Sequence, residues 1–359
     1  MATLTTQISS PAALEEEQPI VQIPSGQHLN IAIYQIALHT SLTGLLYGLD
    51  TGSIGPVTEM PQFRASVGDF SDITQGIYVS SILLFAALSS FANGYLADRF
   101  SRKYTILLGA LLACVGATLS ASVSNLPVLF VARAVYGTGI GLGFSTTSVY
   151  LVEIAPATQR GLLGCMVQLL ITIGIAAAYF IVYASVELEG SIAWRLPFVV
   201  QAAVSVILAL GLFFVPFSPR WLMQKGREAE ALENLRKLRN VDATDSRGMQ
   251  QVTRELAEIR TEIRFHERAR QRTSYIEIFH RVSIPSSPRL SNCQPILRPT
   301  LLSIFVMGFQ QFTGVISPYI SFGLKFRSML SCTLHPSFSH KPASHLVKAV
   351  SSHPESQES

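Results

Sequence analysis

The feature that most constrains this chain is a series of apolar blocks, each about as long as a bilayer's hydrocarbon core is thick. A helix needs roughly 20 residues to cross about 30 Å of hydrocarbon. Backbone amides in lipid must be satisfied within the segment, and no period-2 alternation suggests a barrel, so helices are expected. With 48% hydrophobic and 14% charged residues, the sequence predicts an all-α, polytopic membrane protein. The blocks are Ile31 to Pro56, Gly76 to Ala97, Tyr104 to Val123, Pro127 to Leu151, Leu162 to Val186, Trp194 to Val215 and Ile296 to Phe322.

The distribution of lysine and arginine predicts the orientation of these spans. The loops after the second and fourth blocks are basic, and so is the long segment from Pro216 to Arg298, whereas the loops between them carry few basic residues. Basic loops stay on the cytosolic side of a membrane. The even-numbered loops and the N-terminus are therefore expected in the cytosol. The N-terminal tail lacks a basic n-region, so it is not expected to be a cleaved signal peptide.

The polar segment before the last block carries its own helical pattern. Val252, Leu256, Ile259 and Ile263 recur at the spacing of an amphipathic helix, and fewer than two heptads argue against a coiled coil. Short cytosolic helices lying against the bundle are expected, with a solvated helical loop as the alternative. The expected regions are a disordered cytosolic tail (1–28), a six-helix transmembrane bundle (29–215), a cytosolic helical linker (216–295), a seventh transmembrane helix (296–322) and a disordered tail (323–359).

Three charged or polar motifs lie at the expected cytosolic ends of the spans. They read GYLADRFSRKYT (94–105), VYLVEIAPATQRG (149–161) and PFSPRWL (216–222). In order and position they resemble the signatures of the sugar porter branch of the major facilitator superfamily. The resemblance covers roughly Leu29 to Phe322. It implies the amino-terminal six-helix bundle of a sugar transporter in the plasma membrane, the cytosolic linker, and the first helix of a second bundle.

The motif charges have two interpretations. Fixed charges at helix ends oppose entry into hydrocarbon, so they can be simple stop signals. The resemblance implies in addition a cytosolic gate, in which charged groups pair across helix ends when that side is closed. The residues assigned to this gate are Gly94, Asp98, Arg99, Arg102, Glu153, Arg160 and Arg220.

Two charges fall inside the spans themselves. Asp50 lies in the first block and Arg133 in the fourth, and the opposite directions of these blocks allow similar depth in the membrane. Asp50 can be a helix-end cap between Gly48 and Gly52. The alternative, which the resemblance supports, is a proton-coupling pair of Asp50 and Arg133 that breaks when the carboxylate takes a proton.

Amides within spans suit a hydroxyl-rich ligand, because an amide both donates and accepts hydrogen bonds. Gln168 lies in the fifth block, and Gln310 and Gln311 lie in the last one. The resemblance implies that these three bind sugar, with Tyr47 as a pocket aromatic that packs on the sugar ring. Interhelical hydrogen bonding is the alternative for each glutamine.

Four departures from the family pattern affect these expectations. Ser101 replaces a glycine and Ser148 a proline; Phe217 replaces a glutamate, which removes one charge from the gate; and Ile316 replaces an asparagine, which removes one expected sugar contact. The family has twelve helices, and 323–359 match nothing in it. The chain is therefore expected to be an incomplete copy.

The sequence predicts transmembrane transport of a small neutral sugar, as sugar:proton symport by alternating access. The alternative is a non-transporting membrane sensor or regulator derived from such a transporter. No enzyme activity, catalytic residue, metal site or cofactor is expected, and the proton is the coupling ion. The expected partners are the sugar and the lipid bilayer, with no nucleic acid, and nothing in the sequence specifies an oligomer.

Overall fold

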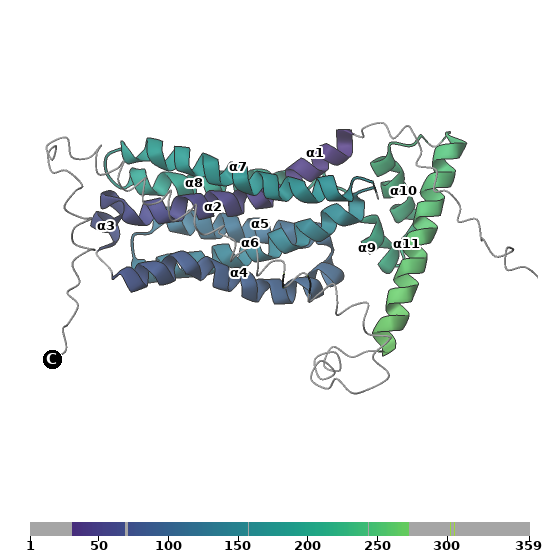
Figure 1. Cartoon of the computed structure of the whole chain (residues 1–359), viewed down its shortest axis with the longest axis horizontal. Coiled ribbons are helices and arrows are strands. Elements are labelled where there is room, and N and C mark those ends of the chain that lie inside the picture. The colour runs from purple at the N-terminus through teal and green to yellow at the C-terminus, as the bar shows by residue number, and fades with distance from the viewer. Residues whose placement is uncertain are drawn as a thin grey trace, which may run out of the picture.

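The computed structural model describes residues 31–68, 71–156, 158–242 and 244–272, together with Leu302 and Phe305. Within these residues the chain is built from helices (Figure 1). They are α1 (Ile31–Thr40), α2 (Leu42–Glu59), α3 (Pro61–Val67), α4 (Asp72–Phe100), α5 (Arg102–Ser122), α6 (Leu126–Ile154), α7 (Arg160–Val186), α8 (Ile192–Gly211), α9 (Pro219–Gln224), α10 (Glu228–Arg239) and α11 (Ser246–Arg272).

Five of the described helices, α4 to α8, are long and apolar enough to cross a membrane. They correspond to the second to sixth expected spans. The first expected span is present as two consecutive helices. A turn at Ser41 divides it into α1 and α2, and α2 is not among the five because it is rich in glycine and hydroxyl residues and contains Asp50. Its polar groups are buried against neighbouring helices, so packing stabilises it where lipid would not.

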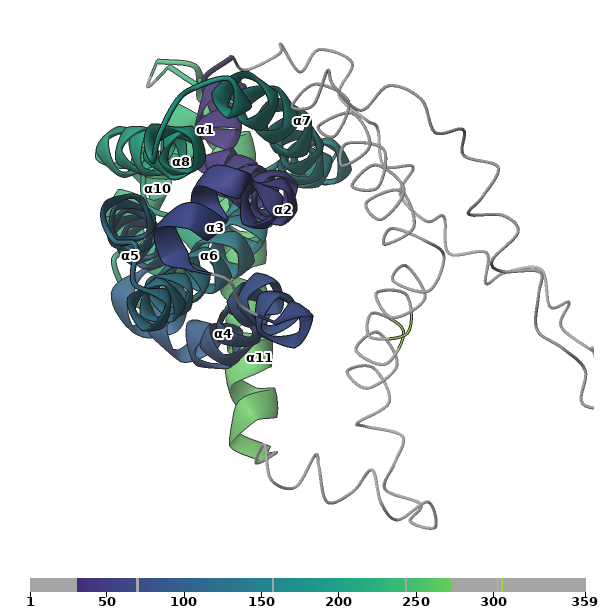
Figure 2. The same cartoon turned by 90° about the vertical axis from the view of Figure 1, so that its left-hand side faces the viewer.

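The long helices form a bundle. Viewed along the bundle, α5 and α8 lie on one side, whereas α2 lies on the other side between α7 and α4 (Figure 2). The most extensive packing joins α5 with α6, α2 with α7, α4 with α6, and α5 with α8. We call the end that carries Arg99, Arg102 and Lys103 the basic end, and the opposite end, where α3 lies, the α3 end.

Glycines allow the backbones to approach closely in this bundle. A Cβ atom added at Gly48 of α2 would lie 2.2 Å from the carbonyl oxygen of Ile171 in α7. On α6, a Cβ at Gly139 would lie 2.5 Å from the amide nitrogen of Ala113 in α5, so a side chain at either position would force the helices apart. Small residues serve the same purpose in membrane helices generally.

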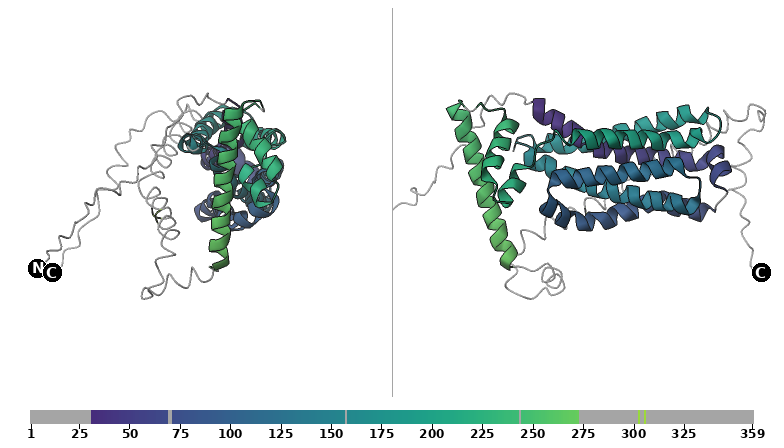
Figure 3. Two further views of the ribbon diagram at one scale, coloured as in Figure 1. Left: turned by 90° about the vertical axis from the view of Figure 1, so that its right-hand side faces the viewer. Right: turned by 180° about the vertical axis from the view of Figure 1, so that it is seen from behind.

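Helices α9, α10 and α11 pack together at the basic end around Trp221, Leu222, Met223, Ala231 and Ile263. The long α11 crosses that end roughly at right angles to the bundle (Figure 3). The apolar spacing that starts at Val252 is the buried face of α11, where Val252 and Ile263 are fully enclosed. These helices occupy 219–272, within the segment expected as a linker.

Several expectations lie outside the described residues. These are the tail 1–28, the end of the linker, the tail 323–359, and the sugar-site residues Gln310, Gln311 and Ile316. Of the expected seventh span only Leu302 and Phe305 are described, and both are helical.

Candidate functional site

The bundle holds a buried ion pair toward the α3 end. Asp50 lies near the middle of α2, and Arg133 lies in the second turn of α6. Nη1 of Arg133 donates a hydrogen bond to Oδ1 of Asp50, and the two side chains are 1% and 2% exposed. The interpretation of Asp50 as a helix-end cap was wrong, because the residue is inside α2. The contact confirms that the two charges lie at the same depth.

Only some of the guanidinium nitrogens of Arg133 have hydrogen-bond partners. Its Nη2 lies 3.5 Å from the carbonyl oxygen of Val79, and its guanidinium carbon lies 5.3 Å from the centre of the Tyr78 ring. The Nε of Arg133 and the hydroxyl of Tyr78 are buried without a hydrogen-bond partner in the described structure. Asp50 is thus the principal anchor of this buried cation. Loss of one member of a buried pair leaves an uncompensated charge, which costs about 3–5 kcal/mol.

Aromatic side chains cover the pair toward the α3 end. Phe63 of α3 is fully buried, with its ring centre 5.2 Å from that of Trp194 and 6.4 Å from that of Tyr78. Tyr78 also meets Phe130 edge-on at 5.4 Å. Sequence reasoning did not select Tyr78 or Phe63. The only available signal was an aromatic residue in a span next to a predicted charge pair.

The predicted sugar-binding residues of the described part lie on the neighbouring helices α2 and α7. Gln168 of α7 is exposed. Tyr47 of α2 is half-buried, and its ring centre lies 5.9 Å from that of Phe144 in α6. One turn beyond Gln168, the exposed Thr172 donates its hydroxyl to the Gln168 carbonyl at 3.2 Å. Sequence reasoning did not select Thr172, a polar group at helical spacing from Gln168.

The basic end carries a second buried ion pair. Arg102, at the start of α5, lies 3.0 Å from Glu153 of α6, and these side chains are 7% and 6% exposed. Arg102 also lies 3.1 Å from Asp98. The second carboxylate oxygen of Glu153 accepts a hydrogen bond of 2.6 Å from the Ser218 hydroxyl, which begins α9. This cluster joins α4, α5, α6 and α9 at one point.

Other predicted gate residues lie outside this cluster. Arg99 is exposed and donates to the Tyr95 hydroxyl at 2.8 Å. Arg220 pairs with Glu262 of α11 at 2.9 Å, away from the Arg102–Glu153 cluster. No ion pair of Arg160 occurs within the described residues. Gly94 faces open space.

Two of the departures from the family pattern have structural consequences here. Ser101, in place of a glycine, has a φ of 102° and a ψ of 147°, and its buried hydroxyl has no partner in the described structure. Phe217, in place of a glutamate, lies among Tyr104, Trp221 and Lys103. The serine thus occupies a conformation that favours glycine.

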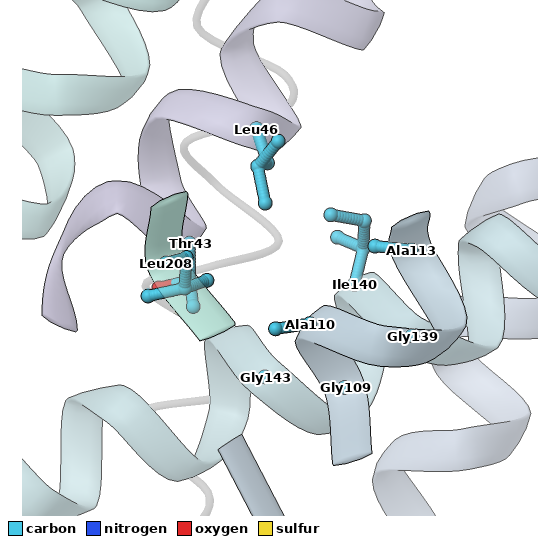
Figure 4. A pocket seen from close by; sticks show the side chains of 9 residues that line it. All are labelled: Thr43, Leu46, Gly109, Ala110, Ala113, Gly139, Ile140, Gly143 and Leu208. Atoms are coloured by element: carbon cyan, nitrogen blue, oxygen red, sulfur yellow. The ribbon is translucent and has the colours of Figure 1, made fainter. Parts of the chain in front are cut away.

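A small gap inside the bundle is too apolar and too small to hold a sugar. It has room for about one water molecule. No group of three or more His, Cys, Asp and Glu side chains that could hold a metal ion occurs in the described part of the chain. The gap is lined by Thr43, Leu46, Gly109, Ala110, Ala113, Gly139, Ile140, Gly143 and Leu208 (Figure 4).

Comparison with known proteins places the chain in a family. The family model described as sugar (and other) transporter matches residues 36–325. The chain belongs to this family. The match includes the Asp50–Arg133 pair, the Arg102–Glu153 pair and the predicted amides.

Individual relatives agree with this assignment. The chain is 39% identical over 198 residues to the glucose transporter GlcP of Staphylococcus epidermidis, covering 55% of this chain and 43% of that protein. It is 35% identical over 216 residues to the galactose-proton symporter of Escherichia coli K12, covering 60% of this chain and 45% of the relative. The chain spans about half the length of the curated relatives it matches.

Solved structures give the same result. The proton:xylose symporter XylE bound to 6-bromo-6-deoxy-D-glucose superposes with a TM-score of 0.59 at 27% identity, covering 67% of this chain and 54% of that one. The partially occluded inward-open form of XylE from E. coli gives a TM-score of 0.55 at 25% identity, covering 65% and 60%. The protein is therefore an all-α, multi-pass integral membrane protein of the sugar transporter family.

Proposed function

We propose that this protein acts in the transmembrane transport of a small neutral sugar, coupled to protons by alternating access. The observation that carries the proposal is the buried Asp50–Arg133 ion pair, which lies one helical turn from Tyr47. Two of the similar proteins are named as proton symporters, one of galactose and one of xylose. The basic end then faces the cytosol, since basic segments are retained there, and the plasma membrane is the expected location.

The pair supplies a way to tie proton uptake to helix movement. While Asp50 is ionised, its attraction to Arg133 holds α2 against α6. A proton on Asp50 removes that attraction and leaves Arg133 with the Val79 carbonyl and the Tyr78 ring. The close glycine-mediated packing of α2 on α7 then lets α2 move as one body with α7. The proton itself is the coupling ion in this scheme, and no further cofactor takes part.

The sugar site is close enough to this pair for the two to communicate. Tyr47 and Asp50 are three residues apart in α2, which is about 4.5 Å along the helix axis. Tyr47 offers a ring face to the apolar side of a sugar, and Gln168 on the neighbouring α7 offers an amide to its hydroxyls. A shift of α2 on protonation of Asp50 would alter the sugar site directly. Gln310 and Gln311 are proposed as further amides of the same site.

Uptake measurements test this function. The chain is expressed, as given and separately with a restored carboxy-terminal half, in cells that lack hexose uptake. Accumulation of labelled glucose, galactose and xylose is followed with and without a proton gradient. The completed chain is expected to accumulate sugar only with the gradient, and Asp50→Asn in that chain is expected to abolish accumulation while leaving exchange of sugar across the membrane. Asp72→Asn is the matched control, because Asp72 is an exposed acid in the first turn of α4.

The sugar site is tested in the same cells. Gln168→Ala is expected to raise the KM for sugar, whereas Gln35→Ala, at an exposed position of α1, is expected to leave it unchanged. Accumulation by Asp50→Asn equal to that of the parent would contradict the coupling scheme. Sugar binding without uptake would instead favour a membrane sensor.

A further inference from the structure

The helices at the basic end are attached to the bundle by several contacts of known geometry. The indole nitrogen of Trp221 in α9 donates to the carbonyl oxygen of Asp98 at 3.2 Å, and Nη1 of Arg239 in α10 donates to that of Ile154 at 3.0 Å. These contacts are distributed around the end of the bundle. Between them, where the chain leaves α8 and enters α9, lies Phe217.

Phe217 is the centre of a group of aromatic and cationic side chains. Its ring centre lies 5.6 Å from that of Tyr104 in α5, in an edge-on arrangement, and 5.8 Å from that of Trp221, nearly parallel. The ammonium nitrogen of Lys103 lies 5.0 Å from the same ring centre. The backbone is held as well, since the Asn234 amide donates to the Phe217 carbonyl at 3.2 Å. Phe217 thus contacts α5 of the bundle and both α9 and α10.

Lys103 has no carboxylate partner among the described residues. Its ammonium group donates to the carbonyl oxygen of Phe213 at 3.1 Å and otherwise faces the Phe217 ring. The nearby carboxylates of Asp98 and Glu153 are taken up by Arg102. At position 217 the sugar porter signature has a glutamate, which could have paired with this lysine. The Phe217 ring therefore interacts with the Lys103 ammonium group at the position where the signature has a glutamate.

We propose that Phe217 and Lys103 form a cation–aromatic latch that fastens α9–α11 to the bundle. A cation over an aromatic face is attracted by the ring quadrupole, and stacking against Trp221 and Tyr104 adds contacts that carry no net charge. An ionic latch between partly exposed groups weakens as salt screens it, whereas stacking does not. The attachment at this point therefore tolerates salt. The inference does not depend on transport of any substrate.

The chain contains a reporter for this latch. Of its two tryptophans, Trp221 stacks on Phe217 and is 7% exposed, and Trp194 lies at the α3 end. In a Trp194→Phe background, the quenching of Trp221 fluorescence by neutral acrylamide measures how often α9 leaves the bundle. The full chain is measured in detergent micelles from about 0.01 M to about 1 M salt, which shortens the Debye length from about 30 Å to about 3 Å.

The proposal makes a distinct forecast for each variant. The parent is expected to show the same quenching at low and high salt. Phe217→Leu is expected to raise quenching by about twofold or more at both, since a cation–aromatic contact accounts for a factor of at least about two in an equilibrium. Phe217→Glu is expected to protect Trp221 at low salt and lose that protection at high salt. Lys103→Met, which keeps the apolar stem, is expected to give a smaller rise that salt does not change.

The matched control is Phe214→Leu. Phe214 is 89% exposed and lies just after α8, so the same chemical change there is expected to leave quenching at the parent value. Unchanged quenching in Phe217→Leu and Lys103→Met, or quenching of the parent that rises with salt, would overturn the proposal. Should Phe217→Leu fail to fold, Lys103→Met alone decides the outcome, because it leaves the aromatic packing in place.

Discussion

Replacing Ser101 by glycine should make the protein more stable. Ser101 joins α4 to α5 with a φ of 102°, and both helices fix it there: its amide donates to the Ala97 carbonyl at 3.2 Å, and its carbonyl accepts from the Thr105 amide at 3.1 Å. A residue with a Cβ in such a region is strained by about 1–3 kcal/mol. Its hydroxyl is also buried without a partner, which costs about 1–3 kcal/mol.

Ser101→Gly removes both costs. Glycine has more conformational freedom in the unfolded chain, which reduces the gain in stability by about 0.5–1 kcal/mol. A net gain of roughly 1–5 kcal/mol is expected. At about 2–4 °C per kcal/mol for a folded unit of about 150–250 residues, the unfolding midpoint should rise by roughly 2–20 °C. The measurement is thermal unfolding in detergent, followed by fluorescence at one fixed scan rate, because unfolding of large proteins is often irreversible.

Two controls separate the backbone from the hydroxyl. Ser101→Ala removes the hydroxyl and keeps the strain, so it should give a smaller rise than Ser101→Gly. Ser41→Ala removes another buried hydroxyl that lacks a partner, at a position with an ordinary φ of −70°. Equal midpoints for Ser101→Ala and Ser101→Gly would show that the strain is no larger than the entropic cost of glycine, about 0.5–1 kcal/mol, and a lower midpoint for Ser101→Gly would refute the reasoning altogether.

Three further outcomes are expected. Gly48→Ala should lower the unfolding midpoint, because its new Cβ would lie 2.2 Å from a carbonyl oxygen of α7, whereas Gly55→Ala, in open space on the same helix, should not; equal effects would contradict the packing argument. Glu153→Gln should destabilise the protein by about 1.5–3 kcal/mol in the same assay, since Arg102 loses its buried carboxylate and keeps only the exposed Asp98, and a loss below about 1 kcal/mol would count against this. A hydrogen bond from Arg236 lowers the pKa of Glu233 from 4.5 to about 2. The ionised Glu233 therefore stabilises the folded state fully above pH 4.5, and this stabilisation is lost as the pH falls through about 2. The difference in unfolding midpoint between the parent and Glu233→Gln should vanish over that window.

The sequence was sufficient to predict the apolar helices and, with the family resemblance, the Asp50–Arg133 pair. Charges enclosed in an apolar bundle must be compensated, so Asp50 and Arg133 had few possible partners besides each other. Spacing along the spans then placed these two groups at matching depths. Arg102 and Glu153 were predicted only as members of one group of gate charges, without a specific pairing.

Other contacts could not be predicted, because the alternative partners or arrangements differ little in free energy. Arg220 is partly exposed, where an ion pair contributes only about 0–1 kcal/mol, so nothing in the sequence favoured Glu262 over other carboxylates. The turn between α1 and α2 is the single residue Ser41, and a break of one residue is too short to be seen in the apolar periodicity of the sequence. The environment of Phe217 required knowledge of how α5, α9 and α10 meet.

The polarity of α2 has a consequence for how the protein is made. This helix precedes the five apolar helices in the chain, yet it is not one of them. Because α2 alone partitions poorly into lipid, it should leave the translocon late or remain beside it. Synthesis of α6 and α7 then provides the helices that bury Asp50 and the α2 glycines. Nascent chains halted after α2 should therefore integrate poorly in a glycosylation-mapping assay, and chains halted after α7 should integrate well. Efficient integration of the shorter chain would show that α2 needs no such help.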